Sequence, residues 1–165
     1  MVRGTDFDAS GKLFTGSPSI EVMQKLGYHQ DDSSENKNRS YSSIITETYI
    51  SGDFASFRFD GIDWNDDTNS PTFGQDGQYD RYCQDLANMG FLGKNDWRRA
   101  VYSELFELVD NQGDINDQYG IAADINYWTK NVNMADKIVS VSLMFGFVNT
   151  EDAEEKFYAS CVTNE

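Results

Sequence analysis

Tyr79-Asp80-Arg81-Tyr82-Cys83-Gln84-Asp85-Leu86 carries one of the two cysteines of this chain. Apolar side chains recur at helical spacing here, at Tyr79, Cys83, Leu86 and then Met89, and Gly90 follows where a helix would end. The pattern predicts an amphipathic helix that turns Cys83 toward the protein interior.

The second cysteine, Cys161, lies near the end of the chain in Phe157-Tyr158-Ala159-Ser160-Cys161-Val162. In a strand, Phe157, Ala159 and Cys161 share one face. A disulfide between the two cysteines would tie this last strand to the internal helix and, in the chain-entropy model, contribute roughly 4 to 5 kcal/mol. Such a bond indicates an extracellular protein. The alternative is a cytosolic protein with two buried free thiols.

Composition limits the classes of partner. The chain has 13 basic and 28 acidic residues, a formal net charge of −15 and a pI of about 4.2. A field of this sign repels nucleic-acid phosphates, anionic lipids and sulfated polysaccharides, and it favours cations and neutral or basic partners. We therefore expect no nucleic-acid partner. An acidic surface that serves only solubility explains the same charge.

Neither a membrane span nor an export signal is evident in the 165 residues, whose number fits a single domain over 1–165. No segment reaches the roughly 18 to 20 apolar residues of a span, so we expect no direct membrane insertion. The N-terminus lacks a basic region followed by an apolar run. If the protein is exported, we expect this chain to be a fragment of a longer surface protein.

Local patterns predict the other elements. Ser17 as N-cap, Pro18 at the first helical position and Gly27 as the stop predict a short helix, and residues 30–43 read as a polar loop. A second amphipathic helix is predicted over 101–109, followed by a long polar loop over 110–126, the kind that is usually functional or mobile. Alternation over 139–147 predicts a single strand.

The sequence argues against several kinds of active site. One histidine, His29, and two cysteines cannot build a four-ligand Cys/His zinc site. Phosphate-binding glycine motifs and a nucleophile elbow are absent, and no carboxylate pair stands out for hydrolysis. We therefore expect a protein that is not an enzyme and requires no cofactor.

Two acidic segments are candidate calcium sites. Asp63, Asn65 and Asp67 place oxygen ligands at alternate positions, as a hard cation requires from a short loop, and residues 110–117 have a similar density of oxygens. Neither segment has the complete EF-hand pattern, and a solvated turn is the alternative for each. Calcium is thus a candidate ligand, with the first segment as its predicted site.

An ordered set of motifs resembles the bacterial Lcl C-terminal family over about residues 54–162. The motifs are Gly61-Ile62-Asp63-Trp64, Tyr82-Cys83-Gln84-Asp85-Leu86, Asp96-Trp97-Arg98-Arg99-Ala100, Tyr127-Trp128-Thr129 and Tyr158-Ala159-Ser160-Cys161-Val162. The family commonly has Trp-Arg-Leu-Pro where this chain has Trp97-Arg98-Arg99-Ala100, and Tyr-Trp-Ser-Ser where it has Tyr127-Trp128-Thr129-Lys130. These departures affect a ligand assignment more than the fold.

The resemblance implies an α+β, C-type lectin-like fold: two helices packed on small antiparallel sheets, a long polar loop region and one disulfide from the helix cysteine to the last strand. Residues 1–50 would supply an N-terminal strand at Lys12-Leu13-Phe14 that pairs with the last strand, the short helix and the polar loop. Residues 51–165 form the family-matching portion. Trp97 and Trp128 would be framework residues, with Arg98 holding the turn after Trp97.

Similar lectin-like modules end intimin- and invasin-type adhesins. We therefore expect a noncatalytic adhesion domain of a bacterial cell-surface or exported protein that binds a protein or glycan of a host or neighbouring cell. Loops on a rigid scaffold are where such folds vary recognition. The expected ligand residues are Asp110, Asn111, Asp114, Asn116, Asp117 and an exposed Tyr127. The alternative function is a structural or assembly cap of a larger surface protein.

Overall fold

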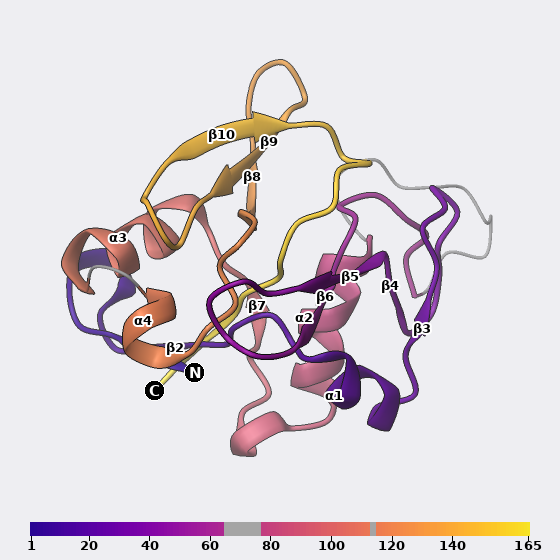
Figure 1. Ribbon diagram of the computed structural model, residues 1–165, viewed down its shortest axis with the longest axis horizontal. Coiled ribbons are helices and arrows are strands. Elements are labelled where there is room, and N and C mark those ends of the chain that lie inside the picture. The colour runs from indigo at the N-terminus through magenta and orange to yellow at the C-terminus, as the bar shows by residue number, and fades with distance from the viewer. Residues whose placement is uncertain (65–76, 113–114) are drawn as a thin grey trace.

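Strands from both ends of the chain pair with each other in the computed structural model, which describes residues 1–64, 77–112 and 115–165 (Figure 1). The four strands of this sheet are antiparallel in the order β1-β2-β11-β7. Their bounds are Val2–Gly4 for β1, Lys12–Phe14 for β2, Arg98–Arg99 for β7 and Cys161–Asn164 for β11. Phe14 lies opposite Val162, so the predicted pairing of the first and last strands is confirmed.

Four α-helices and two 3-10 helices accompany the sheets in the described residues. Their bounds are Ile20–Lys25 for α1, Gln78–Asn88 for α2, Tyr102–Gln112 for α3, Ile115–Tyr119 for α4, Phe7–Ala9 for η1 and Phe91–Gly93 for η2. The predicted α1 N-cap at Ser17 is wrong: Ser19 is the N-cap, and its Oγ accepts a hydrogen bond from the Val22 amide at 3.4 Å. Ser17 instead donates to the carbonyl oxygen of Ala55 at 2.7 Å.

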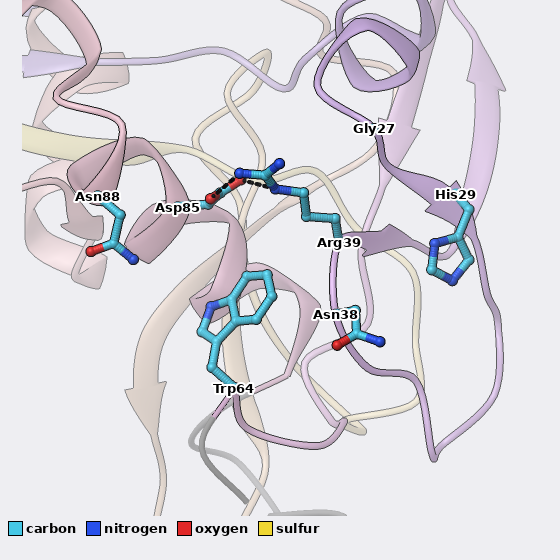
Figure 2. A pocket seen from close by; sticks show the side chains of 7 residues that line it. All are labelled: Gly27, His29, Asn38, Arg39, Trp64, Asp85 and Asn88. Carbon is cyan, nitrogen blue, oxygen red and sulfur yellow. Dashed lines mark hydrogen bonds and ion pairs between the residues drawn. The ribbon is translucent and has the colours of Figure 1, made fainter.

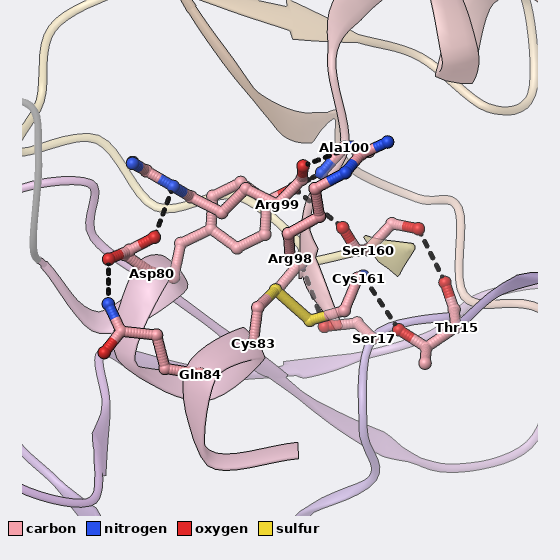
Figure 3. The surroundings of a disulfide bond; sticks show 12 residues. Thr15, Ser17, Asp80, Cys83, Gln84, Arg98, Arg99, Ala100, Ser160 and Cys161 are labelled. Atoms are coloured by element: carbon pink, nitrogen blue, oxygen red, sulfur yellow. Dashed lines mark hydrogen bonds and ion pairs between the residues drawn. A yellow bond between two sulfur atoms is a disulfide. The ribbon is translucent and has the colours of Figure 1, made fainter. Parts of the chain in front are cut away.

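A disulfide between Cys83 on α2 and Cys161 on β11 joins the helix to the last strand, as predicted (Figure 3). The Cα atoms are 5.4 Å apart, and both side chains are buried. Tyr79, one turn earlier on α2, adds a polar link, because its hydroxyl donates to the carbonyl of Ser160 at 2.7 Å and accepts from the Ala100 amide at 3.0 Å. Helix α2 is thus fixed to β11 by the disulfide and to Ser160, the residue just before β11, by a hydrogen bond.

Two apolar clusters form the interior. The first surrounds the disulfide and includes Trp97 and Trp128, which confirms that both are framework residues. Their indole N–H groups are satisfied: Trp97 donates to the Phe91 carbonyl at 2.9 Å and Trp128 to the Phe57 carbonyl at 2.7 Å. The second cluster lies under α3 and α4.

Helix α3 begins at a buried carboxylate. Glu104 is 1% exposed and accepts a hydrogen bond from the Val101 amide at 2.9 Å, the backward half of a capping box. Arg98 contacts both Glu104 oxygens, at 3.0 and 2.6 Å, and Lys12 lies 2.8 Å from one of them. Arg98 therefore holds the turn after Trp97, as predicted.

A three-stranded antiparallel sheet in the order β10-β9-β8 lies at the top of Figure 1, with α1 at the bottom. Its strands are β8 at Tyr127–Val132, β9 at Ile138–Val141 and β10 at Val148–Glu151. The predicted single strand over 139–147 is wrong, because the chain turns after β9 and returns as β10.

Two smaller pairs complete the described sheets. The antiparallel pair joins β5 (Ser43–Thr46) to β6 (Asp53–Ser56). The parallel pair joins β3 (His29–Gln30) to β4 (Ser40–Tyr41). These last two strands lie within or beside residues 30–43, the segment predicted as a polar loop. Among the described residues, no helix has the length and apolar character needed to cross a membrane.

Candidate ligand-binding surface

The segment predicted as a long polar loop over 110–126 is partly helical. Helix α3 continues to Gln112, and α4 occupies Ile115–Tyr119. Ile115 and Ile121 are buried in the cluster below, so the segment is anchored to the core on one side. The Asn116 side chain closes the end of α4 by donating to the Ile121 carbonyl at 2.9 Å. The loop prediction failed because two isolated isoleucines do not make a helical pattern.

The structure separates the predicted ligand residues. Asp110 and Asp117 are exposed, whereas Asn116 is buried. Asn111 is described only as a backbone position of α3, and Asp114 lies outside the described residues. Two of the six predicted positions therefore present side chains at the described surface.

Tyr127 is fully buried, so the expectation that it is exposed is wrong. Its hydroxyl donates to the Ala122 carbonyl at 2.6 Å and accepts from the Ser17 amide at 3.2 Å, and its ring lies 5.3 Å from that of Tyr158. Burial raises the pKa of Tyr127 above its ordinary value. Tyr127, at the start of β8, thus fills the core and does not add to the binding surface predicted on residues 110–126.

The most exposed apolar pair near this segment is on the turn between β9 and β10. Phe145 and Phe147 are each 66% exposed, with ring centroids 5.9 Å apart. Ser142 closes the turn, because its carbonyl accepts from the Gly146 amide at 2.9 Å and its Oγ accepts from the Phe145 amide at 3.1 Å. Gly146 has φ of 72°, a conformation that glycine adopts without strain. Both rings are therefore held at the surface by a hydrogen-bonded turn.

Two cavities meet at Phe145. One, of about 320 Å³, lies against Tyr49, Asn116 and Asp117, and the other, of about 440 Å³, lies against Phe106, Asp110 and Phe147. We call the surface formed by Tyr49, Phe106, Asp110, Asp117, Phe145 and Phe147 the aromatic face. Among the described residues that line the two cavities, none is a lysine or an arginine. The aromatic face is thus apolar at its centre and acidic at its rim.

Sequence reasoning found the acidic rim but missed the aromatic centre. The single strand predicted over 139–147 included Phe145 and Phe147, because the turn at Ser142 was not recognised. Gly146 between the two aromatics was the available signal for that turn.

The predicted calcium site falls mostly outside the described residues. Asp63 is half-buried, while Asn65 and Asp67 lie in the undescribed segment 65–76. Within the described ranges, no group of three or more His, Cys, Asp or Glu side chains is arranged to hold a metal ion. Calcium binding at Asp63, Asn65 and Asp67 stays a prediction.

Short, mainly antiparallel sheets, a helix bonded covalently to the last strand and two apolar clusters define an α+β domain with one buried disulfide. The chain belongs to the Lcl C-terminal domain family, whose model matches residues 55–163. This match confirms the resemblance drawn from the motifs and points to a domain of a surface protein. No curated protein and no solved structure matches the chain.

Proposed function

We propose that this chain is a noncatalytic ligand-binding domain of a bacterial cell-surface or exported protein, with a C-type lectin-like arrangement. Its ligand is a surface protein of a host or neighbouring cell, and the aromatic face is its binding surface. The observation that carries the proposal is the exposed Phe145–Phe147 pair, held on an ordered turn beside Asp110 and Asp117.

Exposure of this pair has a physical cost that binding would relieve. Burial of an exposed phenylalanine side chain stabilises by roughly 1.5 to 3 kcal/mol, and aromatic anchors dominate the energetics of protein interfaces. An ordered turn loses little conformational entropy when a partner docks. In a protein without a partner, polar residues on this turn would avoid the cost of exposing two apolar rings to water.

Charge favours a protein partner with basic residues around an apolar contact. The rim of the aromatic face carries Asp110 and Asp117, and the whole chain has a net charge of −15. A partner of opposite charge would be steered toward this face, with an association rate that falls as salt rises. A sulfated or sialylated glycan would be repelled by the same field.

The proposal assigns no catalytic residue. The disulfide uses both cysteines, so the chain has no free thiol to act as a nucleophile. A cell-surface location agrees with a buried disulfide and with membership of the Lcl C-terminal domain family.

The test begins with arrays of cell-surface proteins and of neutral, sialylated and sulfated glycans, followed by measurement of the dissociation constant for each hit. The double substitution Phe145→Ala/Phe147→Ala is expected to weaken protein binding at least about 30-fold, the effect of removing one strong interface anchor. The matched control, Phe7→Ala/Leu92→Ala, removes two exposed apolar side chains outside the aromatic face and should leave affinity unchanged.

Three results contradict the proposal. Equal affinity of the aromatic-face variant and the control would place the binding surface elsewhere. Binding only to the glycan array would replace the protein ligand by a saccharide. Absence of any hit on both arrays would favour the structural or assembly cap of a larger surface protein.

A further inference from the structure

The half of the aromatic face between α3 and the β9–β10 turn is a cavity of about 440 Å³. This volume lies within the roughly 300 to 1,000 Å³ typical of small-molecule pockets. We call it the α3 cavity. Its described lining comes from two segments: Phe106, Val109 and Asp110 on α3, and Phe145, Gly146 and Phe147 on the turn.

Helical spacing places the three α3 residues on one side of the helix. Phe106 and Asp110 are four positions apart, about one turn of helix, and Val109 belongs to the same turn. The β9–β10 turn approaches this side closely, because a Cβ built on Gly146 would lie 3.5 Å from the Val109 side chain. Val109 is buried and therefore forms the floor of the cavity, while Phe106 and Asp110 lie along one wall.

Aromatic rings come from both segments. On the turn, the rings of Phe145 and Phe147 are 5.9 Å apart at an interplanar angle of 34°. On α3, the ring of Phe106 packs against that of Tyr102, with 5.7 Å between their centroids. The face of an aromatic ring carries the negative end of its quadrupole and attracts a cation within about 6 Å of its centre. Three rings around one space therefore favour a cationic ligand over an anionic one.

The carboxylate of Asp110 adds a negative charge at the rim of the α3 cavity. Asp110 is exposed, and it is the one polar side chain among the described residues that line the cavity. The recess between the turn after α1 and the end of α2 also contains a carboxylate, that of Asp85 (Figure 2). There Arg39 donates to both carboxylate oxygens, each at 2.9 Å, so a ligand cation would have to displace Arg39. The described lining of the α3 cavity includes no such competing cation.

The composition of the lining also selects the kind of cation. Calcium requires about six to eight oxygen ligands, and the lining offers one carboxylate among its side chains. A primary ammonium carries three N–H donors, each of which loses a hydrogen bond to water unless an acceptor replaces it. A trimethylammonium group has no N–H donor, and its charge reaches the rings through methyl groups that can lie on their faces.

We propose that the α3 cavity binds a trimethylammonium group, such as that of choline. Its methyl groups would contact the rings of Phe106, Phe145 and Phe147, with the Asp110 carboxylate beside the charge. The net charge of −15 would raise the local concentration of such a cation. This inference goes beyond the protein ligand proposed for the aromatic face. Because its test uses only the domain and small molecules, failure of either proposal leaves the other standing.

Three related alcohols separate the effect of charge from that of shape. Choline has the trimethylammonium group, 3,3-dimethylbutan-1-ol has carbon in place of the nitrogen and is neutral, and ethanolamine has a primary ammonium instead. Each is titrated into the ¹⁵N-labelled domain while ¹H–¹⁵N spectra are recorded. We expect choline to shift the amide signals of residues 106–110 and 145–147. Choline should bind at least about fivefold more tightly than either analogue, the effect of one exposed cation–π contact.

Conservative variants connect choline binding to the cavity. Asp110→Asn keeps the size of the side chain and removes its charge, and Phe147→Leu keeps an apolar side chain and removes its ring. Each is expected to raise the dissociation constant for choline about threefold to fivefold. The matched controls are Asp136→Asn, on the exposed turn between β8 and β9, and Phe7→Leu, on the exposed side of η1. Both controls should leave the affinity unchanged.

Several outcomes overturn the inference. Equal affinities for choline and 3,3-dimethylbutan-1-ol would show that the cavity recognises apolar shape alone, and tighter binding of ethanolamine would identify a primary-ammonium site. Shifts confined to the recess of Figure 2 would place the cation elsewhere. The absence of any shift with choline, or equal affinities of the two variants and their controls, would exclude the α3 cavity.

Phosphatidylcholine vesicles distinguish the source of the trimethylammonium group. Sedimentation of the domain with these vesicles, weakened by Asp110→Asn and not by Asp136→Asn, would identify a lipid headgroup. Choline binding without sedimentation would identify a soluble molecule. Either result supports the site, provided that choline binds more tightly than its neutral analogue.

Discussion

Removal of the Cys83–Cys161 disulfide is expected to destabilise the domain strongly. The cysteines are 78 residues apart in sequence, and the chain-entropy model gives about 4.5 kcal/mol for a loop of this size. A domain has a total stability of roughly 5 to 15 kcal/mol, so the loss is at least about a third of it. With an unfolding entropy of about 2.1 cal/mol/K per residue, the expected fall in Tm is about 13 °C.

The assay is thermal and urea unfolding, followed by circular dichroism, of the oxidised protein, the reduced protein and Cys83→Ala/Cys161→Ala. Reduction removes only the cross-link, whereas the double variant also removes two buried sulfur atoms. We therefore expect the order of stability to be oxidised protein, then reduced protein, then double variant. The double variant contains no cysteine and should unfold identically with and without reductant.

Two measurements would refute this reasoning. Mass spectrometry of the oxidised protein could find two free thiols, in which case the bond does not form. Alternatively, oxidised and reduced proteins with Tm values within about 3 °C of each other would show that the chain between the cysteines is already restrained in the unfolded state.

The remaining predictions concern the start of α3 and the start of α2. Burial opposes ionisation of Glu104, but the hydrogen bonds from Arg98 and the other nearby donors outweigh it and hold the carboxyl pKa below its ordinary 4.5. This stabilisation of the fold is present above pH 4.5 and is lost as the pH falls through the lowered pKa. Glu104→Gln should therefore lower the free energy of unfolding by about 3 kcal/mol at neutral pH and by less in acid. Urea midpoints from about pH 7 to about pH 3 measure both effects, and parallel pH curves for the two proteins would contradict the assignment. Gly77→Ala would place a Cβ 1.9 Å from the carbonyl oxygen of Phe59 and should cost at least about 2 kcal/mol. Gly11→Ala, where a Cβ meets open space at a positive φ, should cost only about 1 kcal/mol, and equal thermal midpoints would show that the Gly77 contact relaxes freely.

Prediction from sequence worked where one local pattern was strong. Tyr79, Cys83 and Leu86 lie on the buried side of α2, and Gly90 follows its end with φ of 62°. The framework roles of Trp97 and Trp128 also hold, because both side chains are buried in the first apolar cluster. Short elements were less predictable: β9 has four residues, too few for alternation to mark its end.

In the candidate site, too, some residues were predicted correctly from the sequence and others were not. Asp110 and Asp117 were expected at the surface and are there. Tyr127 was expected beside them and lies in the core, since its burial depends on Ser17 and Tyr158, which are distant in sequence. Phe145 and Phe147 were expected within a strand but lie on an exposed turn after β9, where the Phe145 amide donates a hydrogen bond to the Ser142 Oγ.

By itself, the sequence determined the amphipathic helix, the inward position of Cys83 and the only possible disulfide, because helical periodicity is local and two cysteines allow one intramolecular pair. Tertiary structure alone decided which aromatic side chains reach the surface and which lie in the core. Those outcomes depend on contacts between segments far apart in the chain, and the burial of a side chain is set by what packs over it rather than by its neighbours in sequence.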